Sequence, residues 1–165
     1  MSDIILRSFS WSDIPAITAI YRHYVENSAV TFDTEAPGEA AIAEKYAGIQ
    51  KLGHPLIIAE RAGRLAGYAY ASTYRPRAAY RFTCENSIYL DPAETGKGMG
   101  RLLLTELLVQ AQAFGFRQML AVITADTANS IRLHEKLGFA RVGYYSAVGY
   151  KFDRWHDIVH LQKAL

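Results

Sequence analysis

A glycine-rich loop between a strand-like run and a leucine-rich segment is the feature that most limits how this chain folds. Residues 86–90 are typical of a strand, and residues 101–114 form an amphipathic helical pattern that stops at Gly115. Between them lies the run Asp-Pro-Ala-Glu-Thr-Gly-Lys-Gly-Met-Gly at 91–100. Its glycines allow backbone N–H groups to converge on an anion, and the helix N-terminus adds unpaired N–H groups. The loop is predicted to hold a pyrophosphate.

Two common nucleotide-binding motifs do not fit this loop. The triphosphatase loop needs Ser or Thr after Gly-Lys, whereas Lys97 is followed by Gly98. The dinucleotide fingerprint needs other glycine spacing and an acidic residue about 20 positions on. Here the strand after the helix ends in Thr124, Asp126 and Thr127. Neither class of nucleotide is therefore predicted.

Length and composition bound the class of protein. The chain has 165 residues, half of them hydrophobic, with a net charge of +2, which predicts one domain over residues 1–165. Scattered charges predict no nucleic-acid or membrane partner. The start at Ser2-Asp3 and the absence of a long apolar run predict no signal peptide or membrane span. With Cys84 as its one cysteine, we expect a cytoplasmic protein without disulfide or metal.

Periodicity and turn residues predict a mixed α+β chain. A helix begins at residues 12–15 and carries apolar residues to Val25, and Ala62-Gly63 forms the turn of a hairpin. The other helices are expected at 36–52, 101–114 and 129–137. Strands are expected at 4–8, 56–61, 65–74, 85–90, 119–124, 142–146 and 157–162.

The loop and the order of elements resemble those of the GNAT acyltransferase superfamily. Thr95-x-x-Gly98-x-Gly100 is similar to its Gln/Arg-x-x-Gly-x-Gly/Ala loop, which binds the pyrophosphate of acetyl-CoA, with Thr95 replacing the usual Gln or Arg. The resemblance covers nearly the whole chain. It implies the GNAT fold, a central and mostly antiparallel twisted sheet flanked by helices on both faces.

Three further blocks, residues 29–35, 130–139 and 148–157, resemble the phosphinothricin and methionine-sulfoximine N-acetyltransferase branch. This implies an enzyme, typically a homodimer, that moves an acetyl group from acetyl-CoA to the amino group of a small amino-acid-like substrate. Two alternatives stay open. One is a non-catalytic module that senses acyl-CoA, and the other is an acetyltransferase for polyamines, peptides or proteins.

Glu85 is the candidate base. Most of the amine arrives protonated, and only its neutral form attacks a thioester, so a group must take the proton. Strand alternation puts Glu85 and Ser87 on one face and Asn86 on the other. The resemblance implies that Glu85 acts as this base, through a water. The alternative is a solvated strand residue or an ion-pair partner of Arg81.

His134 and Cys84 are weighed as further reactive groups. His134 stands where many GNAT enzymes carry a tyrosine that protonates the departing thiolate, and it is a candidate for that role. The alternative is a structural histidine held by a backbone carbonyl. A thiolate at Cys84 would be a good nucleophile, but its place beside Glu85 turns it toward the core. We therefore expect direct transfer within a ternary complex.

An arginine-rich loop at residues 74–81 is the expected site for the substrate carboxylate, since an arginine binds a carboxylate in two-pronged fashion. The candidates for substrate contact are Phe32, Arg75, Pro76, Arg77, Arg81, Asn86 and Ser87. Phe32 is expected to form an apolar wall, from the same or a partner subunit. The alternative is a solvated basic loop. Lys151, Phe152 and Trp155 either line the pocket or staple the last hairpin, and core packing is expected for the two aromatic residues.

The resemblance also implies contacts with acetyl-CoA. The backbone of Ile88, Tyr89 and Leu90 is expected to align the thioester and pantetheine arm. The pyrophosphate is expected at Thr95, Gly96, Lys97, Gly98, Met99, Gly100 and Arg101. Thr127 stands where the superfamily has an asparagine that binds the arm. Asn129 and Ser130 are candidates for the same contact and for capping the helix.

Overall fold

The computed structural model describes residues 4–165, so Ser2 and Asp3, on which the signal-peptide prediction rests, lie outside the described residues. Four α-helices are described: α1 (Ile14–Asn27), α2 (Glu39–Lys51), α3 (Met99–Phe114) and α4 (Ala128–Lys136). The strands are β1 (Ile4–Ser8), β2 (Leu56–Arg61), β3 (Arg64–Thr73), β4 (Thr83–Leu90), β5 (Gln118–Thr124), β6 (Ala140–Lys151) and β7 (Arg154–Ala164).

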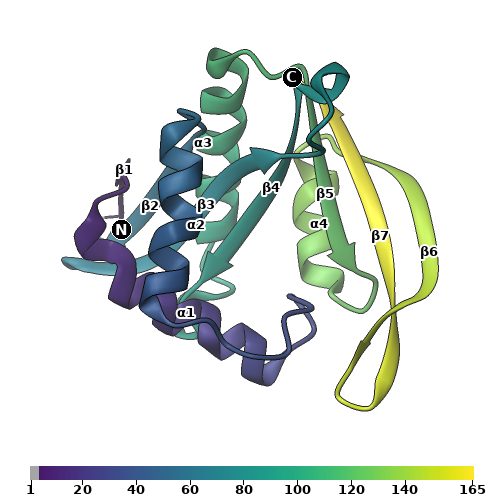
Figure 1. Ribbon diagram of the computed structural model, residues 1–165, viewed down its shortest axis with the longest axis horizontal. Helices are drawn as coiled ribbons and strands as arrows, with labels where there is room; N and C mark the ends of the chain where they lie inside the picture. The colour runs from purple at the N-terminus through teal and green to yellow at the C-terminus, as the bar shows by residue number, and fades with distance from the viewer. Residues whose placement is uncertain (1–3) are drawn as a thin grey trace.

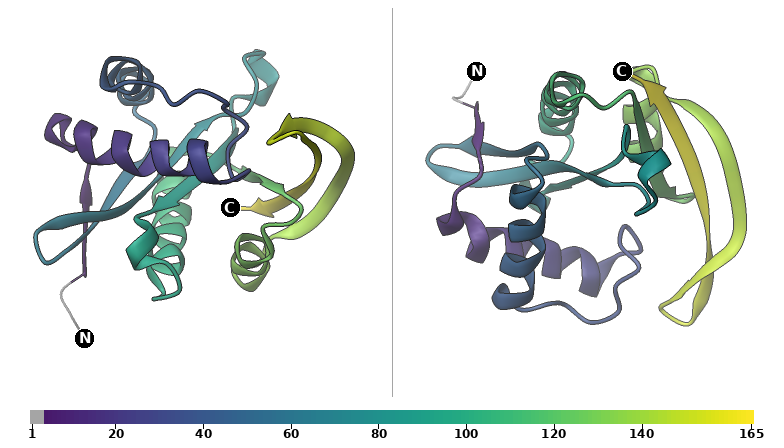
Figure 2. Two further views of the ribbon diagram at one scale, coloured as in Figure 1. Left: turned by 90° about the horizontal axis from the view of Figure 1, so that it is seen from below. Right: turned by 45° about the horizontal axis from the view of Figure 1, so that its top comes forward.

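The strands form one twisted sheet in the order β1-β2-β3-β4-β5-β7-β6, and every pair is antiparallel except β4 with β5. Helices α1 and α2 lie on one face, and α3 and α4 lie on the other (Figures 1 and 2). The predicted fold class is thereby confirmed. The turn between β2 and β3 falls at Ala62 and Gly63, both with positive φ.

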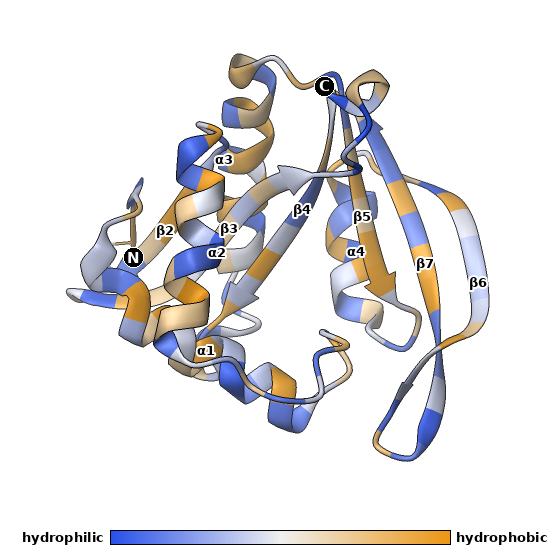
Figure 3. Cartoon of the chain, in the orientation of Figure 1, coloured by the Kyte–Doolittle hydropathy of each residue, from blue (hydrophilic) through white to orange (hydrophobic). Residues whose placement is uncertain are grey.

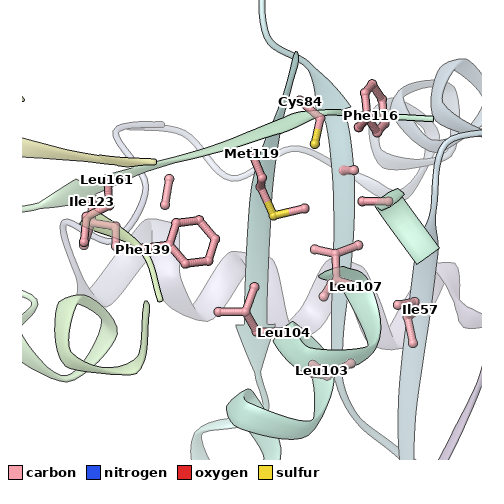
Figure 4. Close-up of a cluster of buried hydrophobic side chains, with 14 of the residues drawn as sticks. Ile57, Cys84, Leu103, Leu104, Leu107, Phe116, Met119, Ile123, Phe139 and Leu161 are labelled. Carbon is pink, nitrogen blue, oxygen red and sulfur yellow. The ribbon is translucent and has the colours of Figure 1, made fainter. Parts of the chain in front are cut away.

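The two faces of the sheet carry separate cores. Leu103, Leu104 and Leu107 of α3 are fully buried against β2, β3, β4 and β5 (Figure 4). Cys84 lies in the same cluster, as the strand alternation predicts. The second core places α1 and α2 on tyrosines of β3 and β4. Strand β5, next to the central strand β4, is hydrophobic along most of its length (Figure 3).

Strands β4 and β5 pair only at their beginnings. Their register runs from Thr83 opposite Gln118 to Glu85 opposite Leu120, and then the strands separate (Figure 1). Strand β4 continues on β3 to Leu90, while β5 continues on β7 to Thr124. Because each strand keeps its outer partner, a wedge opens in the middle of the sheet. The backbone of β4 after Glu85 borders it.

The last hairpin is longer than the pattern predicts. Strands β6 and β7 meet at a tight turn of Phe152 and Asp153, both with positive φ. The predicted core packing of Phe152 and Trp155 is wrong, because their side chains are 54% and 64% exposed. The hairpin extends beyond the body of the sheet (Figure 1), so these two side chains lie outside both cores of the sheet. Helix α2 also begins at Glu39 rather than residue 36, after Gly38 at its N-cap.

The packing of α3 leads to a stability prediction. Replacing Leu104 with alanine leaves a cavity between α3 and the sheet and should lower the free energy of unfolding by about 2–5 kcal/mol. The matched control is Leu102→Ala, on the exposed side of the same helix, which should change it by about 0.5 kcal/mol or less. Urea unfolding followed by circular dichroism measures both. Equal losses in the two variants would contradict the assignment of α3's buried face.

Candidate active site

A cavity of about 240 Å³ lies in the wedge between β4 and β5. It combines residues that are far apart in the sequence, from the segment after α1, from β4, β5 and β7, and from α4. The lining residues are Val30, Thr31, Phe32, Glu85, Asn86, Ser87, Ile88, Tyr89, Val122, Ile123, Thr124, Thr127, Ser130, His134 and Ile158. Since the strands separate here, both faces of β4 contribute side chains.

Glu85 stands at the last position where β4 pairs with β5, and the wedge begins there. Burial raises the pKa of its carboxyl above the ordinary value. The ion pair with Arg81 considered from the sequence does not form in the described residues. The Arg81 guanidinium instead donates to the carbonyl of Ala78 and lies over the ring of Phe82. Glu85 is therefore a carboxylate at the cavity wall whose proton affinity is raised.

Asn86 and His134 link β4 to α4 across the wedge. The Asn86 side-chain oxygen Oδ1 lies 3.1 Å from His134 Nε2, and His134 Nδ1 lies 2.8 Å from the carbonyl oxygen of Ser130. Asn86 and His134 are both buried. Burial lowers the pKa of the imidazole, although the Ser130 carbonyl acts in the opposite direction. His134 is therefore a neutral side chain in this site.

The backbone of β4 offers alternate groups to the wedge. The N–H of Asp91 donates to the carbonyl of Ala66 on β3, so the alternation of an antiparallel pair turns residues 85, 87 and 89 toward β3. The backbone groups of Asn86, Ile88 and Leu90 then point into the wedge. The Leu90 carbonyl already accepts a 2.7 Å hydrogen bond from the Tyr24 hydroxyl. Asn86 and Ile88 thus offer their carbonyls to a ligand.

The glycine loop forms a cradle at the far end of β4. Gly96 and Gly98 have φ of 74° and 83°, which disfavours any residue with a side chain. In residues 4–165 none of the amides from Gly96 to Gly100 donates a hydrogen bond within the protein, while the next two amides donate to Gly98. The loop therefore presents free N–H groups at the start of α3.

Gly100 differs from the prediction, because it is helical and not a positive-φ position. A Cβ there would lie 3.2 Å from the Leu133 side chain, so glycine at this position allows the close packing of α3 against α4. The other side chains of the loop are committed or exposed. Met99 is buried in the core, Thr95 Oγ1 donates to Pro92, and Lys97 pairs with Glu94 at 3.6 Å. Arg101 is exposed at the helix start.

The start of α4 corrects a second prediction. Asn129 and Ser130 do not cap the helix, because Thr127 occupies the N-cap and α4 begins at Ala128. The Asn129 side chain accepts a 2.6 Å hydrogen bond from Arg132. Thr127 and Ser130 line the cavity, whereas Asn129 lines a neighbouring one with Thr127. Thr127 thus faces both cavities.

Residues 28–33, which follow α1 in the connection to α2 and are here called the strap, form one wall of the cavity. Lys151 Nζ donates to the carbonyls of Ser28 and Thr31, at 2.7 and 2.8 Å, and Thr124 Oγ1 donates to the carbonyl of Ala29. Lys151 is only 4% exposed, and burial lowers the pKa of its ammonium group. The ring of Phe32 lies so close to Gly149 that a Cβ there would stand 2.3 Å away.

The fastening of the strap is the part of the site that the residue patterns missed. Phe32 lines the cavity from the same chain, as one of the two predicted possibilities held. The clasp formed by Lys151 and Thr124 was not predicted. A lysine in a strand gives no local signal that its ammonium will bind backbone carbonyls about 120 residues away.

The arginine loop lies beside a second cavity. That cavity is lined by Tyr74, Tyr80, Thr83, Gln118, Leu120, Val142, Gly143, Tyr145, His160 and Gln162. Arg75 stacks on Tyr74, and its charge, second to burial, lowers the pKa of His160. Pro76 and Arg77 are exposed and line neither cavity. The structure therefore does not bring the loop into the first cavity.

The two cavities share one face of the sheet. Leu120 and His160 line the second, while Val122 and Ile158, two positions along the same strands, line the first. Glu85 pairs with Leu120 and so stands between the cavities. An anion cradle, a carboxylate at a strand parting and an open groove beyond it define a group-transfer enzyme with a phosphate-bearing donor.

Comparisons with known proteins name the family. The model of the acetyltransferase (GNAT) family matches residues 17–139. The chain is 43% identical to phosphinothricin N-acetyltransferase of Alcaligenes faecalis, over 93% of this chain and 78% of that protein. It is 38% identical to the L-methionine sulfoximine/L-methionine sulfone acetyltransferase of Salmonella typhimurium, over 93% of this chain and 90% of that protein.

A solved structure agrees with these relatives. The phosphinothricin acetyltransferase from Sinorhizobium meliloti in complex with AcCoA superposes with a TM-score of 0.96 at 43% identity, covering 100% of this chain and 89% of that chain. The chain belongs to the acetyltransferase (GNAT) family, whose members use acetyl-CoA as co-substrate. Residues 4–165 contain no cluster of three metal-ligating side chains, and none of their helices is long and apolar enough to cross a membrane.

The cradle gives a binding prediction. Gly98→Ala forces a side chain into a positive-φ position at a cost of about 1–2 kcal/mol, which should displace the loop amides and weaken acetyl-CoA binding about tenfold. Isothermal titration calorimetry measures the affinity. The matched control is Gly48→Ala inside α2, where a Cβ meets nothing within 4 Å, and its affinity should equal that of the wild type. Unchanged binding in Gly98→Ala would contradict the role of the loop.

Proposed function

We propose that this protein transfers the acetyl group of acetyl-CoA to the α-amino group of a small amino-acid-like substrate of the phosphinothricin or methionine sulfoximine type. The observation that carries the proposal is the position of Glu85. It stands where β4 and β5 separate, between the cavity of the wedge and the open groove. The relatives act on such substrates by their names, which supports the substrate class.

The residues of the wedge suit the donor. The pyrophosphate fits the free amides of the glycine loop, and the backbone of Asn86 and Ile88 fits an extended pantetheine arm entering beside β4. A cavity of about 240 Å³ has room for the thioester end alone, so the nucleotide end stays outside. Acetyl-CoA supplies the activated acyl group, while the chain orients it toward Glu85.

Glu85 is the proposed base. The substrate arrives as an ammonium and must lose a proton before its nitrogen attacks. Burial raises the pKa of Glu85 toward the working range, which makes it a better proton acceptor than an exposed carboxylate. Its position at the cavity wall suits proton uptake through a water.

The transfer is proposed to be direct, within a ternary complex. The alternative, an acetyl-cysteine at Cys84, would need a thiolate that faces the acetyl group. Cys84 is fully buried on the α3 side of the sheet, and burial raises its pKa to about 12. It therefore stays protonated and lies on the face of β4 opposite Glu85.

Replacing Glu85 with glutamine tests the base. We expect kcat/KM to fall by about 100-fold or more, measured by thiol release from acetyl-CoA with methionine sulfoximine and phosphinothricin as acceptors. A base works when deprotonated, so wild-type activity should fall as the pH drops through the raised pKa, above the ordinary value of about 4.3. This limb should be missing in the variant.

Two outcomes would count against the proposal. Full activity of Glu85→Gln would remove Glu85 as the base. If calorimetry shows acetyl-CoA binding but no amino acid, polyamine or peptide is acetylated, the chain is instead a module that senses acyl-CoA. The exposed Glu39→Gln on α2 is the control and should match the wild type.

Arg75 is proposed to bind the substrate carboxylate. It stands beside the second cavity, near the lining residues Tyr145 and His160. Helices α1 and α2 cover the other half of this face (Figure 2). Leu120 and Gln118 of β5 and His160 and Gln162 of β7 line the second cavity, which can receive a small molecule. Arg81 is a weaker candidate, because its guanidinium donates to Ala78.

Substituting Arg75 with glutamine should raise KM for the amino acid about tenfold or more and leave KM for acetyl-CoA unchanged, because a charge-assisted hydrogen bond is lost at one substrate only. Initial rates at varied concentrations of both substrates measure the two constants. The exposed Arg141→Gln, which breaks only the pair with Glu135, is the control. An equal rise in both KM values would exclude this role.

A homodimer is proposed from the surface of the last hairpin. Strand β6 lies at the edge of the sheet, with Val142, Tyr144, Tyr145, Val148 and Tyr150 exposed. An edge strand with exposed aromatic side chains is suited to cover by a second copy. Sedimentation equilibrium should give twice the chain's 18.4 kDa, and Tyr150→Glu should shift it toward the monomer. A monomeric wild type would refute the dimer.

A cytoplasmic location stays a prediction.

A further inference from the structure

The side chain of Asn86 carries a buried polar atom without a partner. Asn86 is 8% exposed, its Nδ2 is buried and makes no hydrogen bond, and the residue lines the cavity of the wedge. Leaving a buried amide atom unsatisfied costs about 1–3 kcal/mol. Because Asn86, unlike the other residues with such atoms, lines the cavity of the wedge, a ligand bound there can supply the missing partner.

The partners of His134 fix where its proton lies. The Ser130 carbonyl can only accept, so Nδ1 carries the hydrogen at 2.8 Å. The imidazole and the ring of Phe139 are nearly perpendicular, with 5.0 Å between centroids, and in residues 4–165 no carboxylate forms an ion pair with the imidazole. A buried imidazole without a counter-ion stays neutral, and its Nε2 is then an acceptor.

This state of His134 determines the orientation of the Asn86 amide. An acceptor at Nε2 needs a donor, and the Asn86 amide is its neighbour at 3.1 Å. The NH₂ group of Asn86 therefore faces Nε2, since the oxygen and nitrogen of an amide exchange by a half-turn of the group. The amide oxygen then occupies the position that has no partner in the protein, and it is an acceptor for a donor in the cavity.

We propose that His134 is a positioning residue that holds the Asn86 amide oxygen toward the cavity, where it accepts a hydrogen bond from an N–H of the pantetheine arm of acetyl-CoA, and that His134 gives no proton to the leaving thiolate. The inference rests on the acetyl transfer proposed above. It changes the role of His134, which the sequence pattern left open between acid and support.

The proton balance of the reaction agrees with this assignment. Attack forms the nitrogen–carbon bond and breaks the carbon–sulfur bond. The substrate ammonium loses one proton to Glu85 before attack and a second once its nitrogen is acylated. The sulfur leaves as a thiolate and requires one proton, which this second nitrogen proton supplies. His134 then has no proton to give, and its Nε2 carries none.

The state of the imidazole is tested on the wild-type protein. The measurement is nitrogen-15 NMR of protein with labelled histidines, in which the His134 signals are assigned by their loss in His134→Gln. From about pH 6 to 8, where histidine ordinarily titrates, the ring should be neutral and protonated at Nδ1. Addition of acetyl-CoA should leave this tautomer unchanged. A charged ring, or a proton at Nε2, would overturn the proposal.

Kinetics of three variants test the action through Asn86. His134→Leu and Asn86→Leu should each raise KM for acetyl-CoA about tenfold, while KM for the amino acid changes little. The double variant should be no worse than either single one, because both remove the same contact. His134→Gln keeps an amide that can accept from Asn86 and should recover most of the affinity. It should also keep the shape of the wild-type pH profile.

The acid role predicts the reverse pattern. A glutamine cannot transfer a proton, so His134→Gln would be as slow as His134→Leu, and the loss would appear in kcat. The fall in activity at high pH that the loss of a catalytic acid's proton causes would also be missing from both variants. That result would refute the proposal. Failure of the proposed function is separable from it, because the tautomer and the affinity for acetyl-CoA, measured by calorimetry, need no turnover. Circular dichroism confirms the folding of each variant.

Discussion

The site depends on the short parallel contact between β4 and β5. Three register pairs hold the two strands together, and beyond Glu85 and Leu120 each strand follows its outer neighbour. A continuous ladder would have used the backbone groups of Asn86 and Ile88 within the sheet. Because the ladder stops, these groups border a cavity, and side chains from both faces of β4 meet there. The strap and α4 line this opening, and the glycine loop follows at the far end of β4.

The order of elements and the position of the anion loop are predictable from the sequence, because both depend on local signals. Apolar periodicity gives α3, and glycines with positive φ give the loop. The length of the last hairpin was not predictable in this way. Its tip, at Phe152 and Asp153, turns through positive φ without glycine, so the pattern lacks the usual turn residue.

The residues of the candidate site likewise differ in whether a local sequence signal predicts their position. Glu85 lies directly before a recognisable loop, so its place at the wedge follows from the chain order. The contacts of His134 and the clasp of Lys151 join segments 48 to 123 residues apart, and no local pattern encodes them. Arg75, Arg77 and Arg81 show the opposite limit. Their residue types predict anion binding, but Arg75 lies over the ring of Tyr74 and Arg81 over that of Phe82, which composition does not reveal.

The strap separates attachment from recognition. Its fastening bonds from Lys151 and Thr124 end on main-chain carbonyls, which every amino acid carries. Val30 and Phe32 instead line the cavity, whereas the Thr31 hydroxyl bonds the Tyr21 hydroxyl. Substitutions at Val30 and Phe32 therefore alter the shape of the wall while the anchor points survive. The side chains of the strap can therefore change while its main-chain anchoring stays the same. A new acceptor preference can evolve in this way without a new fold.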